Sequence, residues 1–139
     1  MKGKYKSIWN KKLLFFIVTM HFVWSLSAQT KVDNEYLVDK QVEAYNVRNL
    51  ELFSSFYAED IEFYNYPDKL LFKGKKAFTE RFTKRFEDAQ LKCTVKNKMI
   101  LGNTLVYEEY IETQSKKYTV LGIYEVENGK IKRLTFIRQ

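Results

Sequence analysis

The sequence predicts an α+β domain in which helical segments come first and a meander of antiparallel strands follows. Three observations support this class. Apolar residues recur at helical spacing in three segments between residues 33 and 88, apolar and polar residues alternate over most of residues 91–138, and turn signals such as Asn128-Gly129 separate the alternating segments. Amphipathic helices and a half-buried sheet of this kind pack together as two layers.

Three helices are expected. The first two cover residues 33–46 and 50–57, with a break near Asn46–Asn49 between them. The third covers residues 75–88, where three phenylalanines repeat every four residues along one face: Phe78, Phe82 and Phe86. An aromatic stripe at this spacing is typical of a helix face that packs into the core.

Six strands are expected, over residues 61–66, 70–73, 91–99, 104–113, 117–126 and 130–138. The third of them alternates cleanly. Its apolar side chains are expected to face the core, and they are Leu91, Cys93, Val95 and Met99. Its lysines are expected to form a solvated row or to border a partner, and they are Lys92, Lys96 and Lys98.

Residues 1–28 have the layout of a secretory signal peptide, and residues 29–139 then form one domain. Five lysines precede the apolar run of residues 13–24, and small residues follow it. Such a run spans only about 18 Å as a helix, too short for a hydrocarbon core of about 30 Å. We expect cleavage after Ser27 or Ala28 and a periplasmic or secreted protein that meets the membrane only during export. A retained membrane anchor is the competing interpretation.

The distribution of charge argues against a nucleic-acid partner. The chain carries 24 Lys and Arg against 17 Asp and Glu, a formal net charge of +7. Residues 1–28 hold five of the lysines and no acid, so the other 111 residues carry 19 basic and 17 acidic side chains. That balance leaves no stripe able to neutralise several phosphates, and we expect no nucleic-acid binding.

The domain also lacks the residues of several common catalytic sites. The only histidine, His21, lies in residues 1–28, so the domain has none for a nucleophilic triad or a zinc site. Cys93 is the single cysteine and is expected to be a small buried side chain. The glycines after residue 28 are isolated, so they form no phosphate loop. The sequence indicates neither a metal nor a cofactor.

Four segments carry a family resemblance through their order and spacing. Residues 42–51 contain a Tyr45-Asn46 break at the end of the first helix, and residues 56–63 run through Glu59-Asp60 into a strand. Residues 72–77 place a glycine before a helix, and residues 123–131 form a hairpin. Together they resemble a SnoaL-like domain of the nuclear-transport-factor-2-like superfamily, over roughly residues 34–138.

The resemblance implies a cone, in which a strongly curved antiparallel sheet wraps round three N-terminal helices and encloses an apolar pocket. It also implies a homodimer formed through the outer face of the sheet, and a small hydrophobic molecule as the partner. Family members include ketosteroid isomerases, polyketide cyclases, dehydratases, epoxide hydrolases and proteins with no catalysis. The fold therefore leaves open whether this protein is an enzyme.

The residues that ketosteroid isomerases use are not matched. In a gap-free alignment the isomerase base falls on Asn65 and its tyrosine donor on Gln41, while its protonated acid falls near Gly122. An amide accepts no proton at neutral pH. Losing the base and the donors removes factors of about 10²–10⁴ and about 10²–10³, so we do not expect that reaction through these residues.

Glu109 is the catalytic candidate. In the strand over residues 104–113, alternation places Glu109 on one face with Leu105, Tyr107 and Ile111, and Glu108 on the other. If the first set faces inward, desolvation would raise the pKa of Glu109 toward values that suit acid–base catalysis. The alternatives are a reversed register, or a Glu109 that lies at the pocket mouth beside a lysine.

Six further side chains are expected to line the pocket: Gln41, Tyr45, Phe63, Asn65, Tyr66 and Tyr124. The tyrosines would lend hydroxyl groups to an apolar cavity. Asn65 would offer a ligand one acceptor and two donors, or it would form an Asx turn before Pro67, and both interpretations stay open.

Two functions follow from these expectations. In the first, the protein is exported, forms a dimer and binds a small hydrophobic molecule, with or without cofactor-independent turnover of the isomerase, cyclase or dehydratase type. In the second, it is a non-catalytic binding or assembly module whose pocket is filled by its own aromatic side chains.

Overall fold

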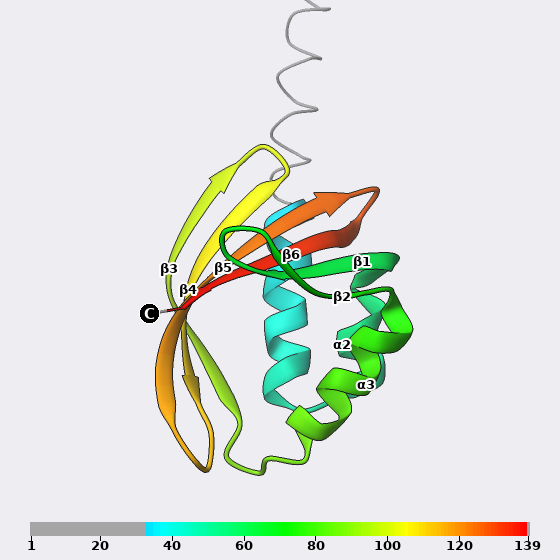
Figure 1. Cartoon of the computed structure of the whole chain (residues 1–139). Coiled ribbons are helices and arrows are strands. Elements are labelled where there is room, and N and C mark those ends of the chain that lie inside the picture. Colours follow the sequence, from blue (N-terminus) through cyan, green and yellow to red (C-terminus); the bar gives the residue numbers. More distant parts are fainter. Residues whose placement is uncertain (1–32, 139) are drawn as a thin grey trace, which may run out of the picture. The chain divides into compact units, whose positions relative to one another are not determined.

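The structure is a computed structural model that describes residues 33–138 (Figure 1). Residues 1–28, which the sequence assigns to a signal peptide, lie outside the described residues. Within residues 33–138, no helix is long and apolar enough to cross a membrane.

The described chain begins with a helix over residues 33–46. The elements after it are α2 (Leu50–Ser55), β1 (Tyr57–Asn65), β2 (Lys69–Lys73), α3 (Lys75–Phe86), β3 (Lys92–Leu101), β4 (Thr104–Glu112), β5 (Lys117–Glu127) and β6 (Lys130–Arg138). The α+β class predicted from the sequence is confirmed. The first strand is longer than expected, because the chain extends directly after α2 and Tyr57 already belongs to β1.

The six strands form one sheet in the order β2-β1-β6-β5-β4-β3. The expected meander holds for β3 to β6, because the β3–β4, β4–β5 and β5–β6 pairs are all antiparallel. β1 pairs with β2 in antiparallel fashion and with β6 in parallel fashion. Figure 1 shows that the sheet is strongly curved and that the helices lie on its concave side. This arrangement is the cone expected from the sequence.

Local signals account for where the helices begin. Arg48 has a positive φ of 55°, which ends the first helix, and the side chain of Asn49 then caps α2 by accepting a hydrogen bond from the Leu52 amide at 3.0 Å. Gly74 has a φ of 89°, a backbone conformation that glycine adopts without strain, and α3 begins directly after it.

The aromatic stripe of α3 packs into the core, as expected. Phe78 is fully buried, and Phe82 and Phe86 pack against the buried cluster. Phe53 of α2 contacts all three, with ring centroids 4.8–5.5 Å away. Aromatic pairs at these separations stabilise a core beyond the area that they bury.

A β-bulge in β3 overturns one expectation. The pairing of β3 with β4 shifts register between Val95 and Asn97, so the strand faces exchange after that point. Met99, expected to face the core, is 70% exposed. Lys98, expected in a solvated lysine row, instead turns toward the first helix and pairs with Asp39 there.

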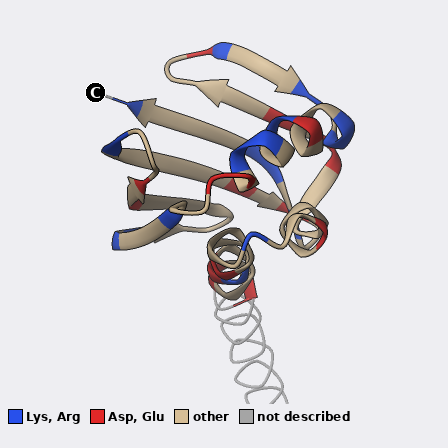
Figure 2. Ribbon diagram, turned by 90° about the horizontal axis from the view of Figure 1, so that it is seen from below, with Lys and Arg blue, Asp and Glu red and all other residues tan. Residues whose placement is uncertain are grey.

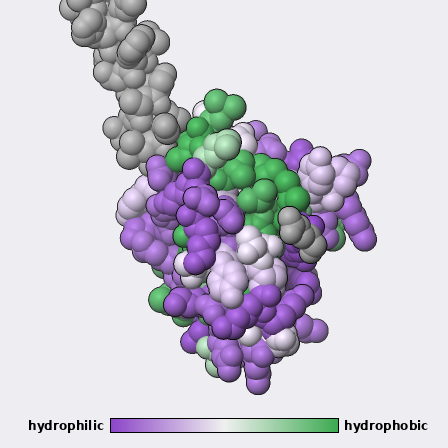
Figure 3. All heavy atoms as spheres, turned by 90° about the vertical axis from the view of Figure 1, so that its left-hand side faces the viewer, coloured by the Kyte–Doolittle hydropathy of each residue, from purple (hydrophilic) through white to green (hydrophobic). Residues whose placement is uncertain are grey.

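The outer face of the sheet carries an apolar patch (Figure 3). Met99, Val106 and Ile123 are register partners on β3, β4 and β5. Leu101 and Leu121 are also exposed. This is the face that the expected homodimer would use, and the dimer stays a prediction.

Candidate functional site

A cavity of about 290 Å³ lies among the described residues. Helix residues on one side and residues of all six strands on the other line it. Most of the wall is apolar or aromatic, and it includes Val42, Phe53, Phe63, Ile111, Val120 and Leu134. Small-molecule sites are commonly apolar concavities of about 300–1,000 Å³ with a few placed polar groups, so this cavity lies near the lower end of that range.

The cavity wall contains one buried carboxyl group, Glu109. Alternation along β4 places it inward with Leu105, Tyr107 and Ile111, and its side chain is only 3% exposed. The register is therefore the one in which the candidate residue faces the core. Its role in catalysis stays a prediction.

A chain of hydrogen bonds connects Glu109 to the first helix. The Tyr124 hydroxyl donates to Glu109 Oε1. Gln41 Nε2 donates to the Tyr124 oxygen at 3.4 Å, and the Tyr57 hydroxyl donates to Gln41 Oε1 at 2.9 Å. All four side chains are buried, so these three hydrogen bonds connect groups that are largely removed from water.

Burial determines the protonation state of this chain. Desolvation raises the pKa of Glu109 to about 7, and the hydrogen bond from Tyr124 opposes part of that rise. Burial also raises the pKa values of Tyr124 and Tyr57 well above their usual range, so both stay protonated donors. Glu109 is therefore the member of the chain that gains and loses a proton near neutral pH.

Gly122 makes room for this carboxyl group. A Cβ atom at position 122 would lie 2.9 Å from Tyr124 Cε2, 3.1 Å from Phe136 Cε1 and 3.3 Å from Glu109 Oε1. The side chains of Glu109 and Tyr124 thus occupy the space that a side chain at position 122 would need. A side chain at this position of β5 would therefore displace the Tyr124 ring from its place beside Glu109.

Basic residues line the rest of the cavity. We call them the basic mouth: Arg81, Lys84, Arg85, Lys116 and Arg138. The first three lie on α3, Lys116 lies between β4 and β5, and Arg138 ends β6. Figure 2 shows the basic end of β6 beside the C-terminus.

Arg85 organises the basic mouth through two tyrosines. Its Nε donates to the Tyr45 hydroxyl at 3.1 Å, and its Nη2 donates to the Tyr118 hydroxyl. Lys116 Nζ lies 4.8 Å from the centre of the Tyr118 ring, and the Arg138 guanidinium lies 5.4 Å from that of Phe136. Aromatic faces attract these cations without neutralising their charge.

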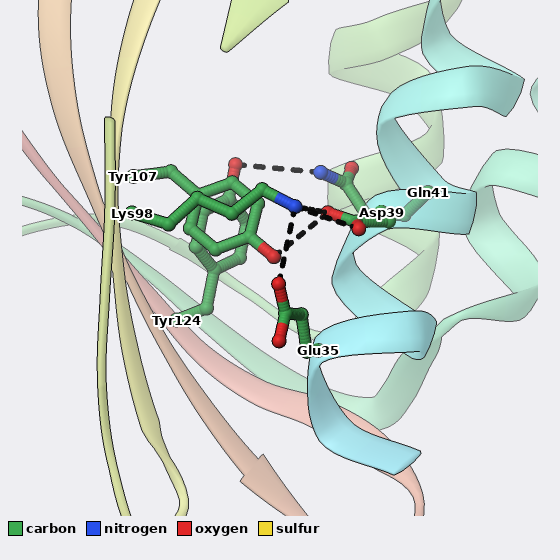
Figure 4. Close-up of polar contacts among 6 residues, drawn as sticks. All are labelled: Glu35, Asp39, Gln41, Lys98, Tyr107 and Tyr124. Carbon is green, nitrogen blue, oxygen red and sulfur yellow. Dashed lines mark hydrogen bonds and ion pairs between the residues drawn. The ribbon is translucent and has the colours of Figure 1, made fainter. Parts of the chain in front are cut away.

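A second polar cluster also joins the first helix to the sheet (Figure 4). Lys98 Nζ lies 2.7 Å from Asp39 Oδ1 and 3.3 Å from Glu35 Oε1, and the Tyr107 hydroxyl donates to Asp39 Oδ1 at 2.8 Å. We call these four residues the helix–sheet cluster. Lys98 is the one cation of this cluster and is shared by two carboxylates, and these contacts join the first helix to β3 and β4.

The structure brings together most of the side chains that the sequence assigns to the pocket. Gln41, Tyr45, Phe63 and Tyr124 line the cavity with Glu109. Asn65 and Tyr66 are not among the lining residues. The side-chain oxygen of Asn65 is buried without a hydrogen-bond partner among the described residues, and the Tyr66 side chain is 61% exposed. Binding roles for all six stay predictions.

Sequence reasoning missed the basic mouth. The i, i+4 spacing of Arg81 and Arg85 signals a shared face of α3, but nothing local connects that face to Lys116 or Arg138. Cys93 is buried and lines the cavity, and burial raises its thiol pKa, so it stays protonated. Among residues 33–138, no group of three or more His, Cys, Asp or Glu side chains could hold a metal ion.

Comparison with known proteins identifies the family. The family model of the SnoaL-like domain matches residues 38–134. No curated protein matches the chain. Among solved structures, a cystatin-fold protein from Novosphingobium aromaticivorans is 20% identical, with a TM-score of 0.70 and coverage of 76% of this chain and 97% of its own.

Two further solved structures have the same fold. An NTF2-like protein of unknown function from Mesorhizobium loti is 10% identical, with a TM-score of 0.70 and coverage of 78% of this chain and 93% of its own. An LEH-like epoxide hydrolase from M. tuberculosis is 14% identical, with a TM-score of 0.64 and coverage of 78% and 84%. At these identities the likeness establishes the fold alone. The family model, which covers more than half of the chain, shows that the chain belongs to the SnoaL-like domain family.

Proposed function

We propose that the protein binds a small, mainly apolar molecule in the cavity and that Glu109 transfers a proton to or from it without a cofactor. The observation that carries this proposal is a buried carboxyl group on the cavity wall, with a pKa of about 7. A group with that pKa is present in both protonation states at neutral pH. It can therefore act as a general base and return the proton as a general acid.

The neighbours of Glu109 support the same role. Tyr124 holds one carboxyl oxygen and leaves Oε2 without a hydrogen bond from any described residue, so that oxygen is available for a ligand. Gln41 fixes the Tyr124 hydroxyl in turn. Proton transfer needs a group held within about 3 Å of the proton that it moves, and this chain restricts how far the carboxyl can turn.

The class of reaction is one that proceeds by proton transfer alone, such as isomerisation, cyclisation or dehydration. The epoxide hydrolase among the compared structures is a precedent for an enzyme on this fold, with a different reaction. The positions that would match ketosteroid isomerases hold Asn65, Gln41 and Gly122. We therefore assign proton transfer to Glu109, on β4, and not to those positions.

Two probes test the proposal. N-Phenyl-1-naphthylamine, a neutral apolar dye, should bind saturably if the cavity accepts ligands. 5-Nitrobenzisoxazole, whose ring opens when a base removes its C3 proton, should react faster than in an equal concentration of acetate. The C3–H bond breaks, its electron pair forms the nitrile as the N–O bond breaks, and a coloured phenolate forms. The rate should rise with pH through about 7, as Glu109 ionises.

Glu109→Gln is the decisive variant, because it keeps the shape of the side chain and removes its base. We expect dye binding to persist and ring opening to fall by about 10²-fold or more. Glu108→Gln is the matched control: Glu108 lies on the other face of β4, where it accepts from Asn97, and does not line the cavity. Equal ring opening in wild type and Glu109→Gln would contradict the assignment.

The alternative function is a non-catalytic module, and the aromatic packing favours it. Phe53, Phe78 and Phe82 contact one another and occupy much of the interior beside the cavity. Saturable dye binding without accelerated ring opening would identify a binding protein. The absence of both would identify a packed assembly module.

We also propose that the protein acts after export, in the periplasm or outside the cell, because of the layout of residues 1–28. A native mass spectrum of protein purified from that compartment measures the cleavage point, the oligomeric state and any bound ligand together. Protein that keeps residues 1–28 would contradict cleavage, and a monomer would contradict the homodimer.

A further inference from the structure

The basic mouth is the most strongly charged surface that borders the cavity. None of its five cations has a carboxylate within ion-pair distance among the described residues. Elsewhere, cations such as Lys73 and Lys98 pair with carboxylates at 2.7 Å. Two acids follow α3: Glu87 forms no ion pair with the described residues, and Asp88 accepts from the backbone amides of Gln90 and Gln114. The protein itself therefore does not neutralise this end of the cavity.

The geometry of Arg85 adds a directed donor to this charge. Its Nε and Nη2 are held by Tyr45 and Tyr118, while Nη1 makes no hydrogen bond with any described residue. The guanidinium is half-buried and lines the cavity. A fixed, partly desolvated guanidinium is a strong site for a carboxylate or phosphate oxygen.

From these observations we infer that the natural ligand is an amphipathic anion. Its anionic group, of which a carboxylate is the simplest, binds Arg85 and the rest of the basic mouth, and its apolar part enters the cavity toward Glu109. This inference rests on the proposed function, because it requires that the cavity bind a ligand. Beyond the proposed function, it specifies that the ligand is negatively charged and that its charged end lies at the basic mouth.

A matched pair of probes separates charge from apolar fit. 2-Naphthylacetate and 2-naphthaleneethanol share one aromatic body and differ in the charge of the terminal group. By calorimetry, we expect the anion to bind at least about tenfold more tightly, a difference of about 1.4 kcal/mol. We expect 0.5 M NaCl to weaken binding of the anion and to leave binding of the alcohol unchanged, because salt screens charge.

Variants locate the attraction. Arg85→Gln and Lys116→Gln should each lower the ratio of anion to alcohol affinity several-fold and leave alcohol binding unchanged. Lys76→Gln is the matched control, because it removes the same charge from an exposed position on α3 that does not line the cavity. If Arg85→Gln fails to fold because its tyrosine contacts are lost, Lys116→Gln and the salt series decide the question.

The outcomes are distinct. Equal binding of the two probes overturns the anionic ligand and leaves the proposed function standing. Binding of neither probe overturns both. An equal loss in Lys76→Gln and Lys116→Gln overturns the assignment to the basic mouth, because net charge would then explain the preference.

Discussion

The two ends of the cavity wall use polar residues in opposite ways. At the inner end, one carboxyl group, Glu109, is almost fully buried and forms a hydrogen-bonded chain with Tyr124, Gln41 and Tyr57. At the outer end, the basic mouth carries five charges with no carboxylate partner among residues 33–138. The inner end holds a single ionisable carboxyl group within hydrogen bonds, while the outer end gathers several cations without a carboxylate partner.

Solvent explains how both ends coexist. A buried carboxylate is costly unless it is paired, and desolvation by burial raises the pKa of Glu109. Cations at a wet surface cost little when they are unpaired, because water and salt screen them. Substitutions at the inner end should therefore change stability, while those of the exposed mouth cations, such as Lys84 and Lys116, should change binding and leave stability nearly unchanged.

The largest effect is expected for the stability of Glu109→Gln as a function of pH. The folded-state pKa of about 7 lies above the ordinary value of 4.5, so the native state binds the proton more tightly than the unfolded state does. The Glu109 contribution is thus fully present below about pH 4.5 and is lost as pH rises through about 7. We expect the variant to gain roughly 3 kcal/mol relative to wild type between pH 4 and pH 8.

Urea unfolding at a series of pH values measures this difference. Glu108→Gln serves as the control, because the group that it removes is solvent-accessible and outside the cavity. A wild-type curve parallel to that of Glu109→Gln over this range would contradict a raised pKa for Glu109.

The next largest effect is expected for Tyr124→Phe. The change removes the donor to Glu109 and leaves Gln41 Nε2 without its acceptor, and buried polar groups left unpaired cost about 1–3 kcal/mol. Because the Tyr124 hydrogen bond lowers the pKa of Glu109, its loss should also move the midpoint of the pH-dependent stability upward. Urea unfolding across the same pH range measures both. An unchanged midpoint would show that Tyr124 does not bond to the carboxylate.

A smaller loss of stability is expected for Gly122→Ala. The new Cβ would lie 2.9 Å from the Tyr124 ring, and that ring is buried and cannot move away freely. Overpacking of this kind costs typically about 1–3 kcal/mol. Alanine also lowers the backbone entropy of the unfolded chain, which offsets part of this loss. Thermal unfolding measures the loss. Tyr124→Phe keeps the ring, so the clash remains when both substitutions are combined. If Gly122→Ala then causes no loss of stability, the loss in the single variant arises from the Tyr124–Glu109 hydrogen bond and not from the clash.

Sequence alternation grouped the residues of the inner end of the cavity, and the structure shows that their face of β4 is the buried one. In β4, strict alternation brings Glu109 to the buried face with Leu105 and Ile111, because strand side chains have a period of two. The same rule failed in β3, where a bulge between Val95 and Asn97 exchanges the faces and exposes Met99. A bulge adds one residue to a strand without a reliable change in composition, so the sequence did not reveal it.

The basic mouth could not be predicted, for a different reason. Its cations come from α3, from the β4–β5 connection and from the end of β6, and each of these segments also contains residues of other character. In the sequence after residue 28, basic and acidic side chains are nearly equal in number, which gives no sign of a local cluster of cations. Only the fold gathers Arg85, Lys116 and Arg138 at one opening, through long-range pairings such as Val120 with Arg138.

The smallest change in stability is expected for a substitution in the basic mouth. It is best compared with a substitution of the same charge in the helix–sheet cluster. Lys84→Gln should change stability by no more than about 0.5 kcal/mol, and toward greater stability, because it relieves repulsion among cations. Lys98→Gln should instead lose about 0.5–1 kcal/mol, because it removes the cation shared by Asp39 and Glu35. The two variants remove the same charge, so urea unfolding in low salt compares their surroundings directly. A loss in Lys84→Gln as large as that in Lys98→Gln would mean that the mouth cations are structural, and their unpaired charge would no longer argue for an anionic ligand.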